Sequence, residues 1–272
     1  MAGQLGNPAA GRLEIAVPSV GHLRFDDGAP VRAASGVVGF EDGWLVVSDD
    51  ATHAALWTDH SVDRVRVLPP IGGLDLFEDA SGTKHLKPDL EAACGVDLEG
   101  SAGAVLMGSG SLPARMRGVL LREGTRTAHV ADLTVLHQRV AAALDLPIAQ
   151  LNLEGAVVIE GVLRWFQRGN AHLRIPSASV DAVQDGPVAD AALVLLEGRR
   201  VVALGRVPDA EPGGAAGPDK IEGLALAGVH GATLDVVAVV DADDHLAPSR
   251  ALRLAVTVPG EPPGNVTGPG VS

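Results

Sequence analysis

The chain has 272 residues, 46% of them hydrophobic and 20% charged, with a formal net charge of −13 at pH 7. This is the composition of a globular protein with enough residues to bury a core, and no apolar run is long enough to span a bilayer. The negative charge repels polyanions, which excludes nucleic acid and membrane surfaces as partners and favours a cation or a neutral small molecule.

The two ends of the chain differ in composition from the part between them. Residues 1–11 and the Gly- and Pro-rich tail at 258–272 hold too few apolar side chains to pack, so both are predicted to be disordered, with one domain over 12–257. Residues 1–11 also lack the basic start and apolar stretch of a secretory signal, and the single cysteine excludes an internal disulfide. We therefore expect a cytoplasmic protein.

Short apolar runs separated by turn residues fill the region between the two ends. The runs are rich in Val and Leu, and Gly, Asp, Pro and Asn separate them, which is the pattern of strands joined by tight turns. The predicted strands are residues 12–17, 37–40, 44–48, 53–57, 63–68, 103–108, 117–121, 126–131, 154–159, 162–167, 171–175, 190–196, 199–206, 221–226, 233–240 and 250–257.

One segment has helical instead of strand periodicity. An amphipathic helix is predicted near 132–144, begun by Asp132 as its N-cap and ended before Pro147. The apolar residues at helical spacing are Leu133, Leu136, Val140 and Leu144.

A longer pattern recurs along the chain. In each copy a polar residue opens one apolar run, and a second apolar run ends in a cluster of small polar residues. The opening residues are Glu91, Glu154 and Glu222, and a fourth copy over 34–50 keeps the pattern without a carboxylate. Self-similar units of several short strands predict radial repetition, as in a β-propeller whose blades are four-stranded antiparallel sheets.

The fold class predicted from these units is all-β, a single β-propeller. The four full units and a reduced unit at 190–207 give five or six blades, and the strand at 12–17 is expected to pair with the last unit and close the ring. A sandwich or two small barrels would be the rival architecture.

The repeat also predicts where its polar residues meet. In an antiparallel meander, the start of the first strand and the end of the second lie at the same end, so both polar groups face one mouth of the channel. The inserted helix, which precedes Glu154, is expected to cover this mouth. The predicted mouth residues are Glu91, Glu154, Glu222, Arg168, Asn170, Asp243, Asp244, Asp49, Asp50 and Ser109.

Two kinds of chemistry suit such a mouth. Converging carboxylates are typical of a divalent cation such as calcium, with Glu91, Glu154 and Glu222 as ligands. Alternatively, each carboxylate pairs with a basic side chain in a structural network, and Arg168, inside one copy of the motif, favours this interpretation. His53 and His245 follow polar clusters, but their setting is typical of loop histidines, so no catalytic residue is assigned. Other basic residues near the motifs are Lys87, Arg115, Arg117 and Lys220.

The motif set resembles a family of bacterial propeller proteins with no assigned function, over about residues 30–257. The Glu-Gly strands are more distantly similar to those of phytase-like esterase-domain proteins and of the gluconolactonase and senescence-marker propellers. The resemblance implies about six blades and, through the distant relatives, a divalent metal in the channel and hydrolysis of an ester or lactone. The chain departs from the near family at 170–185 and lacks the ligand set of a lactonase. The motifs are residues 87–92, 108–111 with 117–121, 152–156 with 167–170, and 221–225 with 241–244.

Two functional hypotheses follow from the sequence. The favoured one is a propeller without catalysis, whose acidic and polar mouth binds a small-molecule ligand or a protein partner. The alternative is a divalent-metal-assisted hydrolase of an ester, lactone or phosphoester, with the helix at 132–144 as a partial lid.

Overall fold

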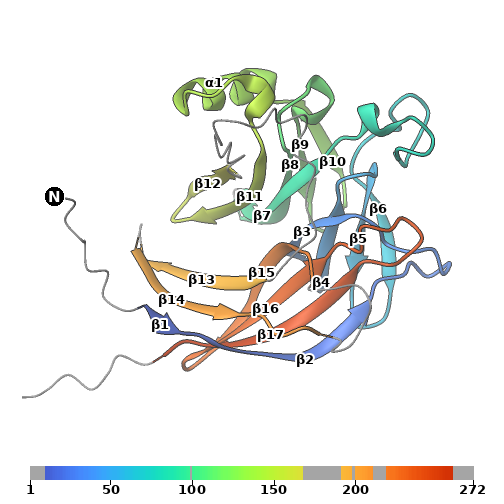
Figure 1. Cartoon of the computed structure of the whole chain (residues 1–272). Coiled ribbons are helices and arrows are strands. Elements are labelled where there is room, and N and C mark those ends of the chain that lie inside the picture. The colour runs from blue at the N-terminus through green and yellow to red at the C-terminus, as the bar shows by residue number, and fades with distance from the viewer. Residues whose placement is uncertain (1–9, 99, 168–190, 198–199, 211–218, 260–272) are drawn as a thin grey trace, which may run out of the picture.

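The computed structural model describes residues 10–98, 100–167, 191–197, 200–210 and 219–259 (Figure 1). These residues form 17 strands, the single α-helix α1 (Thr134–Ala143) and three short 3-10 turns, which confirms the all-β prediction. No helix formed by the described residues is long and apolar enough to cross a bilayer. The predicted disorder at 1–11 and 258–272 falls mostly outside the described residues.

Three sheets have four strands each, and all their neighbouring strands run antiparallel. The first comprises β3 (Ala34–Phe40), β4 (Gly43–Ser48), β5 (His53–Trp57) and β6 (Val62–Arg66). The second comprises β7 (Leu90–Leu98), β8 (Ser101–Gly108), β9 (Arg117–Arg122) and β10 (Ala128–Asp132). The third comprises β15 (Ile221–His230), β16 (Thr233–Val240), β17 (Arg250–Thr257) and β2 (Glu14–His22).

The pairing of β2 with β17 joins the beginning of the chain to its last strand. This confirms the predicted closure by the N-terminal strand, although the strand starts at Glu14 and extends to His22. Because β2 covers the outer edge of β17, that edge has no unpaired backbone groups to offer another chain.

Two smaller sheets complete the described structure. β11 (Leu153–Ile159) and β12 (Val162–Gln167) form a two-stranded sheet, and β13 (Ala192–Glu197), β14 (Arg200–Arg206) and β1 (Gly11–Arg12) form a three-stranded sheet. The β13–β14 hairpin is the reduced unit predicted at 190–207. The strand predicted at 171–175 lies outside the described residues, and the number of blades, five or six, stays a prediction.

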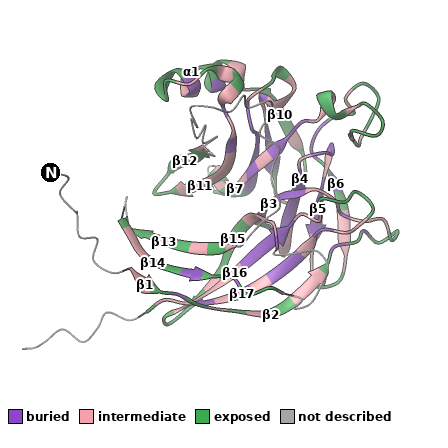
Figure 2. Cartoon of the chain, in the orientation of Figure 1, coloured by how far each residue is buried: buried purple, intermediate pink, exposed green. Residues whose placement is uncertain are grey.

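The first strands of four sheets, β3, β7, β11 and β15, lie at the centre of the molecule. β3 contacts both β15 and β7, and β7 contacts β11, so four first strands stand side by side in a propeller-like arrangement (Figure 1). Successive side chains of a strand point to opposite faces, so Leu45 of β4 packs into the core shared with the β7–β10 sheet, and Val46 into the core shared with β16. Both are fully buried, and Figure 2 shows the burial concentrated in these sheets.

The helix α1 is shorter than the predicted segment, and a different face of it is buried. The Asp132 carboxylate accepts a hydrogen bond from the Thr134 amide at 2.7 Å, just before the helix begins. Leu136 and Leu144 of the expected apolar stripe are 41% and 46% exposed. The buried side chains are instead His137 and Ala141.

A polar contact explains why His137 faces inward. Its Nε2 lies 3.1 Å from the Gly108 carbonyl oxygen at the end of β8, and its Nδ1 lies 3.0 Å from the Leu133 carbonyl oxygen. The imidazole also meets the Trp165 ring edge to face, with 5.0 Å between the ring centroids. The helix is therefore fastened to β8 and β12 by a buried histidine, which a pattern of apolar residues does not reveal.

Replacing Gly110 with Ala is expected to lower the free energy of unfolding by about 2–4 kcal/mol. Gly110 has φ +95°, and a Cβ there would lie 2.1 Å from Cδ2 of His137. Gly124→Ala is the matched control, because Gly124 has φ +75° with nothing within 4 Å of an added Cβ, and a loss of about 1 kcal/mol is expected. Equal losses in urea unfolding would contradict the proposed packing of His137 on this loop.

Candidate functional site

The second residue of each of four central strands is a β-bulge. The strand register skips one residue between Ala34 and Gly36 of β3, and the same irregularity occurs at the second position of β7, β11 and β15. A bulged residue is left out of the ladder, and its side chain is redirected. The four bulged residues, which we call the collar, are Ser35, Glu91, Glu154 and Glu222.

Small residues after the collar let the central strands come close together. A Cβ on Gly223 would lie 2.8 Å from the Gly36 Cα, so any larger residue would force β15 away from β3. Ser35 also ties strands together, since its hydroxyl donates to the Leu90 carbonyl oxygen at 2.6 Å. The repeated Glu-Gly pair thus combines a redirected side chain with a close strand contact.

The collar lies between two cavities. The mouth cavity has a volume of about 530 Å³, and the channel cavity has about 370 Å³. All four collar residues line both cavities. The described residues that line the mouth cavity include eleven carboxyl groups against five Lys or Arg side chains. The channel cavity beyond the collar is lined by Gly36, Val37, Ala93, Gly155, Ala156, Val157, Phe166, Ile221, Gly223 and Leu224.

Most of the residues predicted for the mouth line this cavity. Ser109 does not line it, because its side chain is fully buried and its hydroxyl donates to the Asp89 carboxylate. Arg168 and Asn170 lie outside the described residues. The predicted residues that line the mouth cavity are Glu91, Glu154, Glu222, Asp49, Asp50, Asp243 and Asp244.

The residue two positions before each collar residue also lines the mouth cavity, and it gives each carboxylate a different neighbour. Asn152 donates from Nδ2 to Oε1 of Glu154 at 2.7 Å. Lys220 places its Nζ 3.0 Å from Oε1 of Glu222. The corresponding neighbour of Glu91 is Asp89, another acid.

Glu91 belongs to a cluster of three carboxyl groups that contains one ammonium group. Asp49, Asp89 and Glu91 each offer an oxygen within 4.8 Å of the others. Lys87 binds Asp49, and its Nζ lies 3.1 Å from Oδ1 of Asp89, whose other oxygen, Oδ2, lies 3.1 Å from the Arg115 guanidinium group. No hydrogen bond or ion pair joins the Glu91 carboxyl group to another described residue. The cluster therefore holds more acids than its own cations pair with directly.

The protonation of this cluster reflects that excess. Burial raises the pKa of Glu91 well above its usual value, and repulsion from Asp49 and Asp89 adds to the effect. Burial also raises the pKa of Asp49 to about 7, although the Lys87 ammonium acts in the opposite direction. Burial would lower the pKa of Lys87, but Asp49, Asp89 and Glu91 raise it above its usual value. Lys87 is therefore charged at neutral pH, whereas Asp49 and Glu91 hold their protons to a higher pH than ordinary carboxyl groups do.

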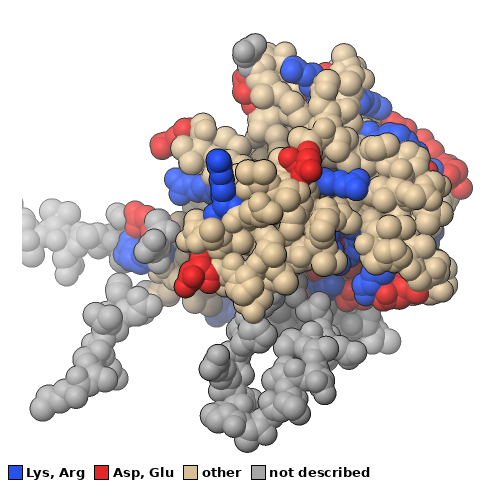
Figure 3. Space-filling view, turned by 90° about the horizontal axis from the view of Figure 1, so that it is seen from above, with Lys and Arg blue, Asp and Glu red and all other residues tan. Residues whose placement is uncertain are grey.

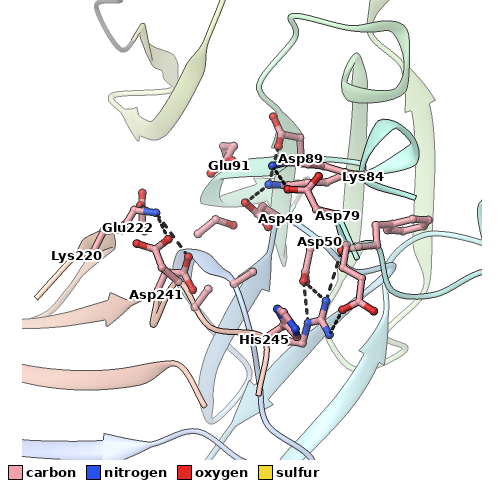
Figure 4. Close-up of a pocket in the computed structure, with 18 of the residues that line it drawn as sticks. Asp49, Asp50, Asp79, Lys84, Asp89, Glu91, Lys220, Glu222, Asp241 and His245 are labelled. Carbon is pink, nitrogen blue, oxygen red and sulfur yellow. Dashed lines mark hydrogen bonds and ion pairs between the residues drawn. The ribbon is translucent and has the colours of Figure 1, made fainter. Parts of the chain in front are cut away.

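Two further groups of charges stand around the mouth cavity (Figure 4). Lys220 lies 2.7 Å from Asp243 and 3.6 Å from Asp241, in addition to Glu222. Arg32 pairs with Oδ2 of Asp50 at 2.7 Å. Asp50 is only 7% exposed, and its other oxygen, Oδ1, is buried without a hydrogen-bond partner among the described residues. Oδ1 of Asp49 is in the same situation.

A chain of backbone hydrogen bonds holds the rim of the mouth cavity together. The Asp49 amide donates to the Ala33 carbonyl oxygen at 3.1 Å, and the Asp89 amide donates to the Asp49 carbonyl oxygen at 2.9 Å. Ser109 donates in turn to Asp89, and Leu153 to Ser109, both at 3.0 Å. These bonds connect three neighbouring sheets, so the acidic side chains project from a fixed frame.

Among the described residues, the helix and His53 do not line the mouth cavity, whereas His245 does. No residue of α1 is among the described residues that line the mouth cavity, so the expectation of a covering helix is wrong. His245 lines both the mouth cavity and a neighbouring cavity, and His53 lines only the neighbouring one, with its ring centroid 5.5 Å from that of Phe25. Burial lowers the pKa of His53, with Arg64 acting in the same direction.

One face of the outer surface differs from the mouth cavity in its charge pattern. On the face seen from above, the described acidic and basic side chains are interspersed among other residues (Figure 3). This face therefore differs from the mouth cavity, where the described lining residues include more carboxyl groups than basic groups.

Some residues of the cavity were not found from the sequence. Asp89 and Asn152 stand two residues before a collar glutamate, and comparing the four copies at this offset would have found them. Glu78, Asp79 and Lys84 come from the segment between β6 and β7, which has no counterpart in the other copies and gives no periodic signal.

The fold and the cavity define an all-β, propeller-like protein with an acidic cavity at one end of its central channel. The chain belongs to the family described as "Family of unknown function (DUF6929)", whose model matches residues 30–180. A second model, "Family of unknown function (DUF6910)", matches residues 175–245. No curated protein and no solved structure matches the chain, so the resemblance to phytase-like and gluconolactonase propellers stays a prediction.

Proposed function

We propose that this protein binds a small, positively charged ligand in the mouth cavity, where the collar carboxylates receive its cationic group. The main support is Glu91. Lys87 and Arg115 pair with the other two acids of its cluster, Asp49 and Asp89, but the Glu91 carboxyl group makes no hydrogen bond or ion pair with another described residue. A carboxylate in such surroundings is stabilised by a cation that donates hydrogen bonds to it.

An ammonium or guanidinium group has the donors that these acids need. An ammonium group carries three N–H donors and a guanidinium group five, and neither accepts a hydrogen bond. Asp49 and Asp50 line the same cavity, and the Oδ1 atom of each is a buried acceptor without a hydrogen-bond partner among the described residues. A concave site with one sign of charge also concentrates ligands of the opposite charge.

A divalent cation is the second candidate, and with it metal-assisted hydrolysis of an ester, lactone or phosphoester. The observation in its favour is the approach of Asp49, Asp89 and Glu91 within 4.8 Å. Calcium takes about six to eight oxygen ligands, and here Lys87 already binds two of the three carboxylates. Glu222, one of the ligands predicted from the sequence, is paired with Lys220. Because lysine side chains already pair with several of these carboxylates, the cluster fits a metal ion less well than an organic cation, and we rank the divalent cation second.

Calorimetric titration with ethylammonium at low ionic strength tests the proposal. We expect saturable binding to the wild-type protein. In Glu91→Gln the affinity is expected to fall at least tenfold, a loss of about 1.4 kcal/mol of binding free energy, because the amide keeps the shape of the side chain but removes its charge. Glu14→Gln is the matched control, since Glu14 is exposed on β2 and does not line the cavity. Acetate serves as the anionic control ligand and is expected not to bind.

The same titration separates the two candidates. Calcium binding at micromolar concentration that ethylammonium does not displace would favour the metal site. Absence of binding by both cations, in a folded protein, would contradict both candidates.

A further inference from the structure

The polarity of the central cavities changes abruptly at the collar. On one side lies the mouth cavity with its eleven carboxyl groups. On the other side, all described residues that line the channel cavity beyond the collar are glycines or carry apolar side chains, among them Val37, Val157, Phe166 and Leu224. Glu91, Glu154 and Glu222 stand at the boundary itself, because they line both cavities.

We propose that the ligand is an amphipathic cation, an ammonium group that carries an apolar alkyl or arylalkyl substituent. The ammonium group lies at the collar, and the substituent extends into the channel cavity. This inference rests on the proposed function and names the class of its ligand.

The size and the lining of the channel cavity support this class. Its volume of about 370 Å³ falls in the range of about 300–1,000 Å³ that is usual for small-molecule sites. Such sites combine a largely apolar wall with a few polar groups that fix the orientation of the ligand, which is the arrangement around the collar. An apolar substituent in the channel gains free energy by leaving water.

Other cations fit the two cavities less well. A polyamine would place its second charge among apolar groups, where an unpaired charge is strongly disfavoured. A bare divalent cation would use the carboxylates of the mouth cavity and leave the channel cavity without a role. The two cavities together therefore select a ligand that has one charged end and one apolar end.

A series of n-alkylammonium ions from methyl to hexyl tests the inference by calorimetry. Burial of each methylene is worth about 0.8 kcal/mol, so the affinity is expected to rise about fourfold per added methylene until the channel cavity is filled. In Ala93→Phe, an aromatic ring takes up part of the channel cavity, and the increments are expected to disappear while methylammonium binds within twofold of its original affinity. Ala131→Phe, on the exposed outer strand β10, is the matched control and is expected to keep the increments.

A second variant keeps the test decisive if Ala93→Phe does not fold. Leu224 is 48% exposed and lines the channel cavity, so Leu224→Asp introduces an acid there at a tolerant position. We expect the ratio of the affinity for hexylammonium to the affinity for 1,6-diammoniohexane to be more than tenfold lower in Leu224→Asp than in the wild-type protein.

The outcomes distinguish this inference from the proposed function. If every alkylammonium ion binds with the same affinity, the ligand class is overturned and the cation-binding function stands. If no alkylammonium ion binds, both the ligand class and the cation-binding function are overturned. If the affinity rises with chain length but neither variant changes the rise, the substituent binds elsewhere, and the inference is overturned.

Discussion

Replacing Lys87 with Met is expected to lower the free energy of unfolding by about 3 kcal/mol at neutral pH. Removing one partner of a buried ion pair leaves an uncompensated charge, and losses of about 3–5 kcal/mol are usual. Lys87 is the ammonium group that binds Asp49 and Asp89, and its side chain is only 16% exposed. Urea unfolding of both proteins at pH 7 measures the effect.

The loss is expected to shrink as the pH falls. Without the ammonium group, the pKa values of Asp49 and Glu91 rise further in the folded state, so the folded chain retains protons that the unfolded chain releases. The free energy of unfolding of the variant then decreases as the pH rises. Lys84→Met is the matched control, because the Lys84–Asp79 pair lies on the surface, and a change of at most about 0.5 kcal/mol is expected. A loss that grows towards acid pH would contradict this account of the cluster.

Replacing Glu91 with Gln is expected to stabilise the protein at pH 8 and to leave its stability at pH 4 nearly unchanged. The pKa of Glu91 is raised in the folded state above its ordinary value of 4.5. Below that value both states are protonated, and the group costs nothing. As the pH rises through and above 4.5, the unfolded chain ionises first, so the wild-type protein loses stability that the neutral amide keeps.

The Glu91 experiment also separates folding from binding. The same variant is expected to be more stable and to bind ethylammonium more weakly, two changes that a general disturbance of the fold does not produce together. Glu14→Gln is expected to change neither property, because Glu14 is exposed. Equal stability of Glu91→Gln and the wild-type protein across pH 4–8 would show that Glu91 is not under electrostatic strain.

The repeating part of the fold was predictable because its signals are local. β12 and β16 begin and end where the sequence predicts, since each is a mostly apolar run between turn residues. β7 (Leu90–Leu98) was missing from the predicted strands, because Cys94, Gly95 and Asp97 interrupt its apolar pattern. Its position between β3 and β11 comes from tertiary packing that a single strand does not encode.

The site was predictable in part for the same reason. The glutamates of the collar are marked by the Glu-Gly or Glu-Ala pair in the sequence itself. By contrast, the segment that carries Glu78 is brought to the mouth by long-range bonds: the Phe77 amide donates to the Asp50 carbonyl oxygen at 2.9 Å, and Arg66 pairs with Asp75 at 2.7 Å. No spacing rule links residues that meet in this way. The buried face of α1 was missed because a histidine, His137, occupies it.

The bulges at the collar separate the part of each strand that builds the sheet from the part that faces the cavity. A residue skipped by the register has no cross-strand partner, so its identity can change without altering the pairing of its neighbours. The four copies already show this freedom, since they combine Ser or Glu at the bulge with Ala, Asp, Asn or Lys two residues earlier on the same backbone. The side chains that face the cavity can therefore change one sheet at a time, while the pairing of the strands that carry them stays the same.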